Sequence, residues 1–160
     1  MTSVWRIGHC TDPAQPAHAI LAAQGLGATR YSGRWHTMSG RQLVYAAASR
    51  ALCQLEKRVH ANGFQLKNQA LMRLDLPDDA ALQAVEDLGE LPPQWRADVG
   101  LTRRIGDRWL AGGSALGLWV PSAVEPLERN LLLNPAHPAY AGIRLVIERA
   151  PFRFDDRLFS

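Results

Sequence analysis

Short runs of alternating apolar and polar residues are the feature of this chain that most restricts its fold. The clearest runs occur at residues 70–76, 116–120 and 143–147. Alternation with a period of two is typical of β-strands that bury one face only. We therefore expect half-buried strands at these places. Shorter apolar runs predict further strands at residues 5–7, 43–46 and 130–133.

Helix signals stand between these runs, but helices and strands do not alternate strictly. Helical patterns cover residues 17–23, 49–61 and 98–110, and a glycine lies shortly after each of them. Residues 78–95 indicate a solvated helix-and-loop passage. A mixed order of this kind favours an α+β domain over a doubly wound sheet. With a length of 160 residues, we expect one compact domain that spans residues 1–160.

A glutamate interrupts the apolar stripe of the second predicted helix. The stripe recurs at helical spacing, at Leu52, Leu55 and Val59. Glu56 lies inside it, whereas Lys57 and Arg58 are expected to point elsewhere. A buried carboxylate is costly unless a fixed partner or a ligand compensates it. Position alone leaves two explanations: a structural ion pair with an arginine, or a carboxylate in a cleft that stabilises positive charge on a ligand.

The loop-rich segment at residues 25–40 carries more cationic and aromatic side chains than a linker needs. Binding residues often lie on such loops. Arg34, next to Trp35, either stacks structurally or offers bidentate donors to a phosphate group. Tyr31 and Tyr45 are either core aromatics or stacking platforms for an aromatic ring of a ligand.

Ser122 follows a proline at the end of a predicted strand. Most serines in such a position only cap a turn. No Gly-x-Ser-x-Gly sequence surrounds Ser122, so a Ser-His-Asp hydrolase is not expected. The alternative is a hydroxyl group that forms a hydrogen bond with phosphate or ribose.

Composition and motifs argue against several other classes of protein. The formal net charge is +3, but the basic residues are dispersed, so we expect no direct binding to nucleic acid. We find neither a membrane-spanning apolar stretch nor a secretory signal, and we expect a cytoplasmic protein without membrane contact. The two cysteines and five histidines show no metal-ligand spacing, so no metal is expected. Dinucleotide-binding and phosphate-loop glycine motifs are also missing.

Several blocks of the sequence together resemble one family. In chain order they are Trp5-Arg6-Ile7, TRYSGRWH, QLVYAA, LEKRVH, VPSAV and NLLLNPAHP. Their order resembles that of the RES domain, a family of bacterial toxins that destroy NAD. The resemblance runs from about residue 4 to Leu158. The stretch from VPSAV to NLLLNPAHP is the most specific part, because so many residue types fall at fixed separation.

The resemblance implies a fold, an activity and a partner. The fold would be similar to ADP-ribosyltransferases, with short strands in two small sheets, flanking helices and a cleft between the sheets. The activity would be that of an NAD phosphorylase or NAD glycohydrolase, with inorganic phosphate or water as acceptor and no tightly bound cofactor. The partner would be an Xre-type helix-turn-helix antitoxin whose C-terminal end enters the active site, and the family also suggests a homodimer.

Alternatives to NAD destruction stay open at this point. One is ADP-ribosyl transfer to a macromolecule, which would use the same cleft. A weaker one is a toxin directed at nucleic acid, which the positive charge permits.

The resemblance also carries site residues over by motif. The expected catalytic set is Arg34, Tyr45, Glu56 and Ser122, and the expected substrate-binding neighbours are Arg6, Tyr31 and Asn130. The arginines would hold the pyrophosphate or the incoming phosphate, and Tyr31 or Tyr45 would stack on nicotinamide. Glu56 would stabilise the ribosyl cation, and Ser122 would form a hydrogen bond with ribose or phosphate.

Overall fold

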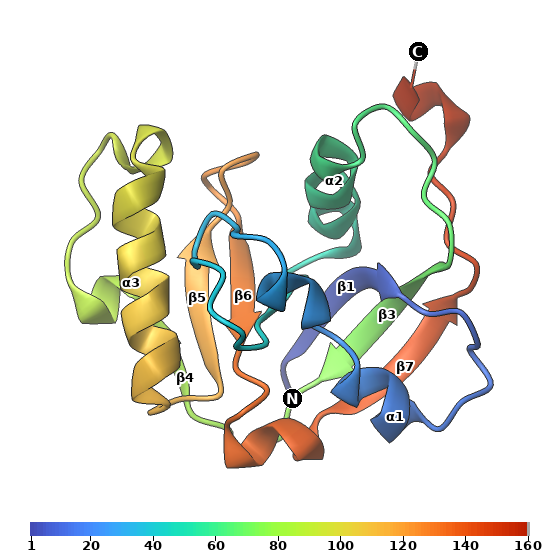
Figure 1. The fold of residues 1–160 in the computed structure, drawn as a ribbon, viewed down its shortest axis with the longest axis horizontal. Helices are drawn as coiled ribbons and strands as arrows, with labels where there is room; N and C mark the ends of the chain where they lie inside the picture. Colours follow the sequence, from blue (N-terminus) through green and yellow to red (C-terminus); the bar gives the residue numbers. More distant parts are fainter. Residues whose placement is uncertain (160) are drawn as a thin grey trace.

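A mixed sheet of seven strands runs through the molecule (Figure 1), in a computed structural model that describes residues 1–159. The strands are β1 (Ser3–His9), β2 (Val44–Ala47), β3 (Gln69–Asp75), β4 (Leu82–Ala84), β5 (Gly117–Pro121), β6 (Arg129–Leu133) and β7 (Arg144–Arg149). Their order across the sheet is β4-β5-β6-β2-β1-β3-β7. The β4–β5 pair is parallel and the other pairs are antiparallel.

Three α-helices accompany the sheet, and all three were expected from the sequence. They are α1 (Ala17–Ala22), α2 (Arg50–His60) and α3 (Val99–Gly112). At the start of α2, Ser49 Oγ accepts a hydrogen bond from the Leu52 backbone N–H at 3.1 Å. Asp98 Oδ1 does the same for the Leu101 backbone N–H at 3.0 Å at the start of α3. Such N-caps fix where a helix begins.

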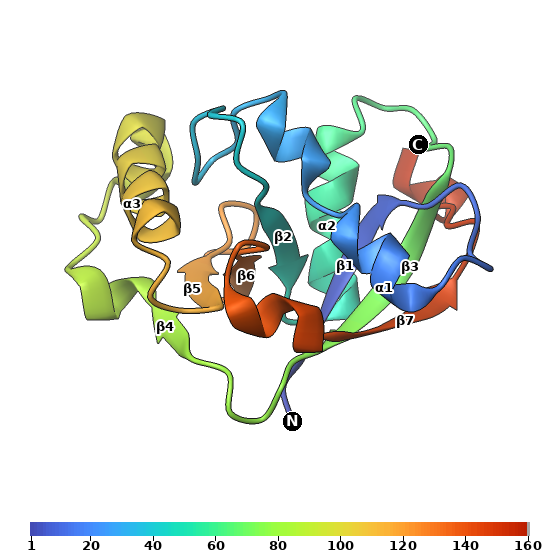
Figure 2. The same ribbon diagram turned by 60° about the horizontal axis from the view of Figure 1, so that its bottom comes forward.

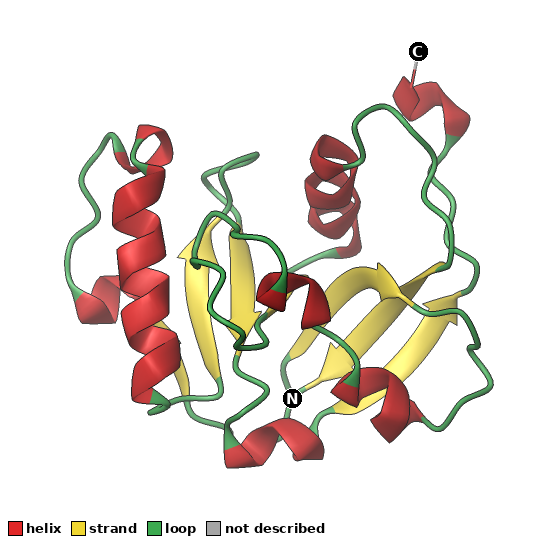
Figure 3. Cartoon of the chain, viewed as in Figure 1, coloured by secondary structure: helices red, strands yellow, loops and turns green. Residues whose placement is uncertain are grey.

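The sheet is divided by its weakest junction. β1 and β3 are paired along seven positions, whereas the register between β1 and β2 consists of the pair Trp5 and Ala47. Figures 1 and 3 show the strands gathered into one group beside α3 and another beside α1. Figure 2 shows β2 between these groups. We call β4-β5-β6-β2 the α3 half and β1-β3-β7 the α1 half.

These observations confirm the α+β prediction and correct one detail of it. The strands do not form two separate sheets, because hydrogen bonding links them in one continuous order. The two groups meet at a single paired position, which explains why the halves look like separate sheets in Figure 3.

Two segments differ from the expectations drawn from their sequence patterns. Residues 78–95 contain β4 together with short 3₁₀ turns, and β4 is too short to show a period. β3 is buried on both faces, because Leu71 is covered as well as Met72. Phe152 and Phe154 pack with Leu71 in one buried cluster, so the C-terminal segment covers that side of β3. The alternating pattern within β3 cannot show that residues from the far end of the chain bury its second face.

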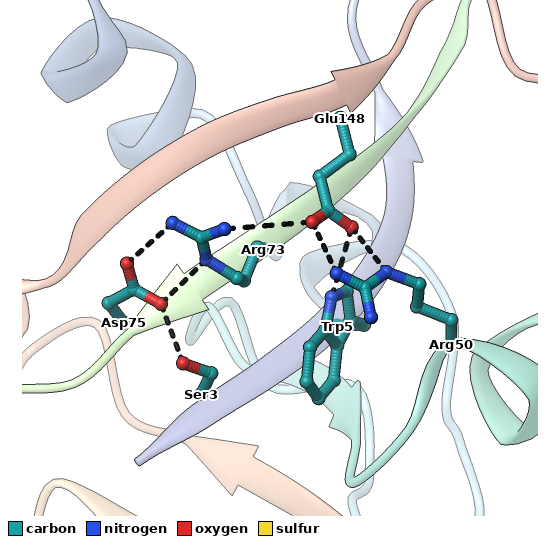
Figure 4. A network of polar contacts seen from close by, with 6 residues as sticks. All are labelled: Ser3, Trp5, Arg50, Arg73, Asp75 and Glu148. Atoms are coloured by element: carbon teal, nitrogen blue, oxygen red, sulfur yellow. Dashed lines mark hydrogen bonds and ion pairs between the residues drawn. The ribbon is translucent and has the colours of Figure 1, made fainter. Parts of the chain in front are cut away.

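A polar network fastens the start of α2 to the α1 half of the sheet (Figure 4). Glu148 on β7 accepts hydrogen bonds from Trp5 Nε1 at 3.0 Å and from Arg50 Nε and Nη2 at 2.8 and 2.6 Å. Arg73 lies between Glu148 and Asp75 and pairs with both carboxylates. The hydrogen bonds from Arg50 hold the pKa of Glu148 below its usual value. This network fixes the orientation of α2 relative to β1, β3 and β7.

Candidate active site

A pocket with a volume of about 640 Å³ lies where the two halves of the sheet meet. Its lining residues come from β1, β2, β6, α2, the loop before β2 and the turn after β5. Pockets of this size hold small-molecule ligands. Two of its walls matter most. The helix wall consists of Cys53, Glu56, Lys57, Val59 and His60, and the loop wall consists of Tyr31, Gly33, Arg34, Trp35 and His36.

The structure brings the predicted site residues together at this pocket. The lining includes Arg6, Tyr31, Arg34, Tyr45, Glu56 and Asn130. Ser122 is fully buried and touches Glu56, so it stands behind the pocket surface. These residues come from six different segments of the chain.

Glu56 is held by hydrogen bonds rather than by an ion pair. Its Oε1 atom accepts from Ser122 Oγ at 2.6 Å and from Asn130 Nδ2 at 2.7 Å. Within residues 1–159, its Oε2 atom makes no hydrogen bond and the carboxylate makes no salt bridge. The structural ion pair weighed from the sequence is therefore wrong. One oxygen fixes the carboxylate, and the other is available on the pocket wall.

Ser122 has a different contact from the one expected. Its Oγ atom donates to Glu56 and accepts from the backbone N–H groups of Val124 and Glu125, both at 3.0 Å. A hydroxyl group has one proton and two lone pairs, so its capacity is used in full. Ser122 orients Glu56 and has no capacity left for ribose or phosphate. The turn-capping explanation applies as well, because both backbone donors belong to the turn after β5.

The apolar stripe expected on α2 is only partly buried. Leu52 is buried, but Leu55 and Val59 are 44% and 57% exposed. The buried face passes instead through Leu52 and Cys53, and the partly buried Glu56 and Lys57 follow on the side of the pocket. Lys57 was expected to point elsewhere, and the structure corrects this. The error arose because α2 is covered from one side only and ends over an open pocket.

The loop wall is fastened to α3. Thr102 Oγ1 donates to the Arg34 carbonyl at 2.6 Å, and Arg103 Nε donates to the Gly33 carbonyl at 2.7 Å. The helix can come this close because Gly106 has no side chain. A Cβ atom there would lie 1.6 Å from the Trp35 carbonyl oxygen. α3 therefore acts as the support that sets the position of the loop.

Tyr45 completes the attachment of the loop from the other side. Its hydroxyl accepts from the Trp35 backbone N–H at 3.2 Å and contacts His36 Nδ1 at 2.7 Å. His36 Nε2 lies 2.8 Å from the Tyr31 carbonyl, which can only accept. This geometry assigns the proton of neutral His36 to Nε2, so that Tyr45 donates to Nδ1. Burial raises the pKa of Tyr45 well above its usual value, which keeps the hydroxyl protonated.

The two arginines of the expected set are held in different ways. Arg34 Nη1 donates to the Arg96 carbonyl at 3.0 Å, and the guanidinium lies 5.9 Å from the centre of the Trp95 ring. Arg6 Nε donates to Gln24 Oε1 at 2.9 Å, and its Nη1 donates to the Tyr45 carbonyl at 3.0 Å. Each guanidinium keeps further N–H groups that could bind an anion. Desolvation lowers the pKa of Arg6 without a neighbouring carboxylate to offset it.

Comparison with known proteins identifies the family. The RES domain model matches residues 3–155. A protein of Pseudomonas putida named Toxin Res is 41% identical over 160 residues, covering 98% of this chain and 99% of its own length. A protein of Sphingobium sp. named Prs ADP-ribosylating toxin is 40% identical over 147 residues, covering 89% of this chain and 88% of its own.

The chain belongs to the RES domain family. The expected resemblance is thereby confirmed. A solved structure, the M. tuberculosis MbcT–MbcA toxin–antitoxin complex, matches 99% of this RES domain and 86% of its own chain. The TM-score is 0.60 at 20% sequence identity, so this likeness concerns the fold.

Sequence reasoning missed three residues of this RES domain that shape the pocket: Gln24, His36 and Lys57. Gln24 is 1% exposed, and its amide donates to the carbonyls of His9 and Ile20 while its oxygen holds Arg6. Gly8 leaves the space for this contact, because a Cβ atom there would lie 2.3 Å from Gln24 Oε1. A glutamine after a predicted helix carries no signal of such a role. His36 and Lys57 could have been noted, since both belong to the RES-like blocks.

The RES domain has no described helix that is long and apolar enough to cross a membrane.

Proposed function

We propose that this RES domain is a toxin that depletes NAD by cleaving the bond between nicotinamide and ribose. The observation that carries the proposal is the Glu56 carboxylate, which is fixed through Oε1 and free at Oε2 on the wall of a ligand-sized pocket. Family membership supports it, because curated relatives of matching length are named as toxins.

Glu56 supplies what this reaction needs. As the C–N bond breaks, its electron pair moves to the pyridinium nitrogen, and nicotinamide leaves as a neutral molecule. Positive charge then develops on the ribose, as in other oxocarbenium-like transition states. A fixed carboxylate beside the ribose stabilises that charge. Ser122 and Asn130 hold the carboxylate in place, so no reorganisation is needed during the reaction.

The remaining lining residues would bind the two ends of the substrate. The N–H groups of Arg6 and Arg34 that stay free are suited to the pyrophosphate or to an incoming phosphate. Tyr31 is 75% exposed at the pocket and can stack on a ring. Tyr45 also lines the pocket, and its hydroxyl fixes the loop wall. Phosphate as acceptor would give ADP-ribose 1-phosphate, and water would give ADP-ribose.

One relative favours a second activity in the same pocket. The Sphingobium protein is named an ADP-ribosylating toxin and is 40% identical to this chain. Transfer of ADP-ribose to a protein would break the same bond and would use Glu56 in the same role.

The same reasoning extends to a partner. The solved structure with a similar fold is that of a toxin–antitoxin complex, MbcT–MbcA. We propose that an antitoxin of the Xre-type helix-turn-helix class neutralises this chain by entering the pocket, and that the toxin forms a homodimer.

Incubation of the purified chain with NAD tests the activity. Nicotinamide release is measured by chromatography, with and without inorganic phosphate. NAD labelled in its adenine separates three outcomes: label in ADP-ribose 1-phosphate, in ADP-ribose, or on a protein. Absence of nicotinamide release under all these conditions would contradict the proposal.

A further inference from the structure

Lys57 is the one lysine of the pocket, and no carboxylate of the described chain pairs with it. It lines the pocket from α2 and is partly buried, yet it makes no hydrogen bond or ion pair within residues 1–159. The other lysine of the chain, Lys67, is exposed. A partly buried ammonium without a partner is costly, and an anion bound in the pocket would offset that cost.

Arg6 lies close enough to make this cost larger. Repulsion from the Arg6 guanidinium and removal from water lower the pKa of Lys57 to about 8, with removal from water the larger cause. Arg6 itself has no carboxylate partner, because its donors go to Gln24 and to the Tyr45 carbonyl. Glu56, the carboxylate of this wall, is engaged by Ser122 and Asn130 and forms no ion pair with either cation.

We propose that Lys57 and Arg6 together form a site for a phosphate group in this pocket. Two cations that line one pocket without a carboxylate partner fit a doubly charged ligand better than a singly charged one. Arg6 offers fixed N–H donors and Lys57 a mobile ammonium, which is a common division of work around phosphate. The phosphate group can belong to inorganic phosphate or to the pyrophosphate of the dinucleotide.

This proposal deepens the proposed NAD cleavage, on which its catalytic consequence rests. If inorganic phosphate occupies the site, one of its oxygens bonds to the ribose carbon as the C–N bond breaks. The electron pair leaves with nicotinamide, and the product is ADP-ribose 1-phosphate. Lys57 would then decide how well phosphate competes with water as acceptor.

A binding experiment tests the site without relying on activity. The chain has two lysines, so ¹³C-lysine labelling gives two side-chain resonances, which a Lys67→Gln variant assigns. We expect phosphate to raise the pKa of Lys57 by about one unit or more and to leave Lys67 unchanged. An effect of ADP-ribose without an effect of phosphate assigns the site to the pyrophosphate. An unchanged Lys57 with both ligands overturns the proposal.

Product analysis gives the second arm. We expect Lys57→Gln to lower the share of ADP-ribose 1-phosphate by roughly tenfold, since a charge-assisted hydrogen bond is lost. Lys57→Arg should restore most of it, which also shows that the site tolerates substitution. The matched control is Lys67→Gln. If the wild-type chain cleaves NAD and Lys57→Gln changes neither the product ratio nor the KM for NAD, the site is refuted while the proposed function stands.

Discussion

The helix wall and the loop wall of the pocket are built on different principles. On the loop wall, the Tyr45 hydroxyl and two side chains of α3 form hydrogen bonds with the loop backbone and the His36 ring. These contacts set the shape of the wall. On the helix wall, Glu56 keeps one free oxygen and Lys57 makes no polar contact in the described chain. A polar group whose hydrogen-bonding capacity is used by the protein holds geometry. A group that keeps free capacity on a pocket wall can act on a ligand.

The difference implies that substitutions on the helix wall change the chemistry. Substitutions that loosen the loop wall should act on binding and stability instead. Five substitutions or conditions test that distinction.

Replacement of Glu56 by glutamine should have the largest effect. The variant keeps the shape of the side chain but loses the charge that stabilises the ribosyl cation, so we expect kcat for nicotinamide release to fall by about 10²–10³-fold. Glu90→Gln is a matched control, because Glu90 is exposed and makes no hydrogen bond or ion pair in residues 1–159. Undiminished cleavage by the Glu56→Gln variant would refute the mechanism.

Replacement of Ser122 by alanine should act through Glu56. The carboxylate loses one of two hydrogen bonds to Oε1 but keeps the one from Asn130, so we expect kcat to fall by about tenfold. The KM for NAD should change little, because Ser122 lies behind the pocket surface. A change confined to KM would mean that Ser122 contacts the substrate after all.

The pH dependence of phosphate use should follow Lys57. Since its pKa lies at about 8, the ammonium is charged below that pH and neutral above it. At phosphate concentrations well below saturation, where the pKa of the free chain governs, we therefore expect the phosphate-dependent product to decline between about pH 7 and pH 9. The other ionisable groups lining the pocket are Arg6, Tyr31, Arg34, His36, Tyr45, Cys53, Glu56 and His60. Comparison with Lys57→Arg, which stays charged, isolates the contribution of Lys57, and identical profiles would contradict it.

Replacement of Tyr45 by phenylalanine tests the loop wall. It removes the hydroxyl that serves Trp35 and His36, and we expect it to lower the free energy of unfolding by about 1–3 kcal/mol. Thermal unfolding measures this loss. We expect the KM for NAD to rise more than kcat falls. A selective loss of kcat in a stable variant would place Tyr45 with the groups that act on the substrate.

Replacement of Glu148 by glutamine should have the smallest effect. It weakens the polar network that fixes the start of α2 to β7. We expect Tm to fall by about 2–4 °C. Because the pKa of Glu148 is lowered in the folded chain, its contribution is present at neutral pH and is lost as the pH falls. The wild-type and variant Tm values should therefore converge at acidic pH, and a constant difference would contradict this role.

The sequence predicted the helices, six of the seven strands and the α+β class, because capping residues and periodic patterns are local. Its errors concern what covers those elements. The stripe that drew attention to Glu56 contains Leu55 and Val59, and both are exposed. Glu56 was therefore singled out for a partly wrong reason. Its real partners, Ser122 and Asn130, lie far away in the chain, and periodicity cannot predict such contacts.

The resemblance to the RES family located residues that line the pocket, but it did not distinguish what each of them touches. Ser122 and Asn130 face Glu56, and the Tyr45 hydroxyl faces the loop. Motifs record which residues accompany each other. They leave open which of two neighbours meets the ligand, as the adjacent Glu56 and Lys57 illustrate.

Because the junction between β1 and β2 is weak, the hydrogen bonds of the site help to hold the two halves of the sheet together. α2 is anchored to the α1 half through Arg50, whereas Ser122 and Asn130 belong to the α3 half. The hydrogen bonds of Glu56 therefore bridge the two halves, together with the Trp5–Ala47 pair and the hydrogen bond from Arg6 to the Tyr45 carbonyl. A change in the angle between the two halves would move the Glu56 carboxylate away from Ser122 and Asn130. A ligand that binds at this junction could therefore inactivate the site without touching the carboxylate itself.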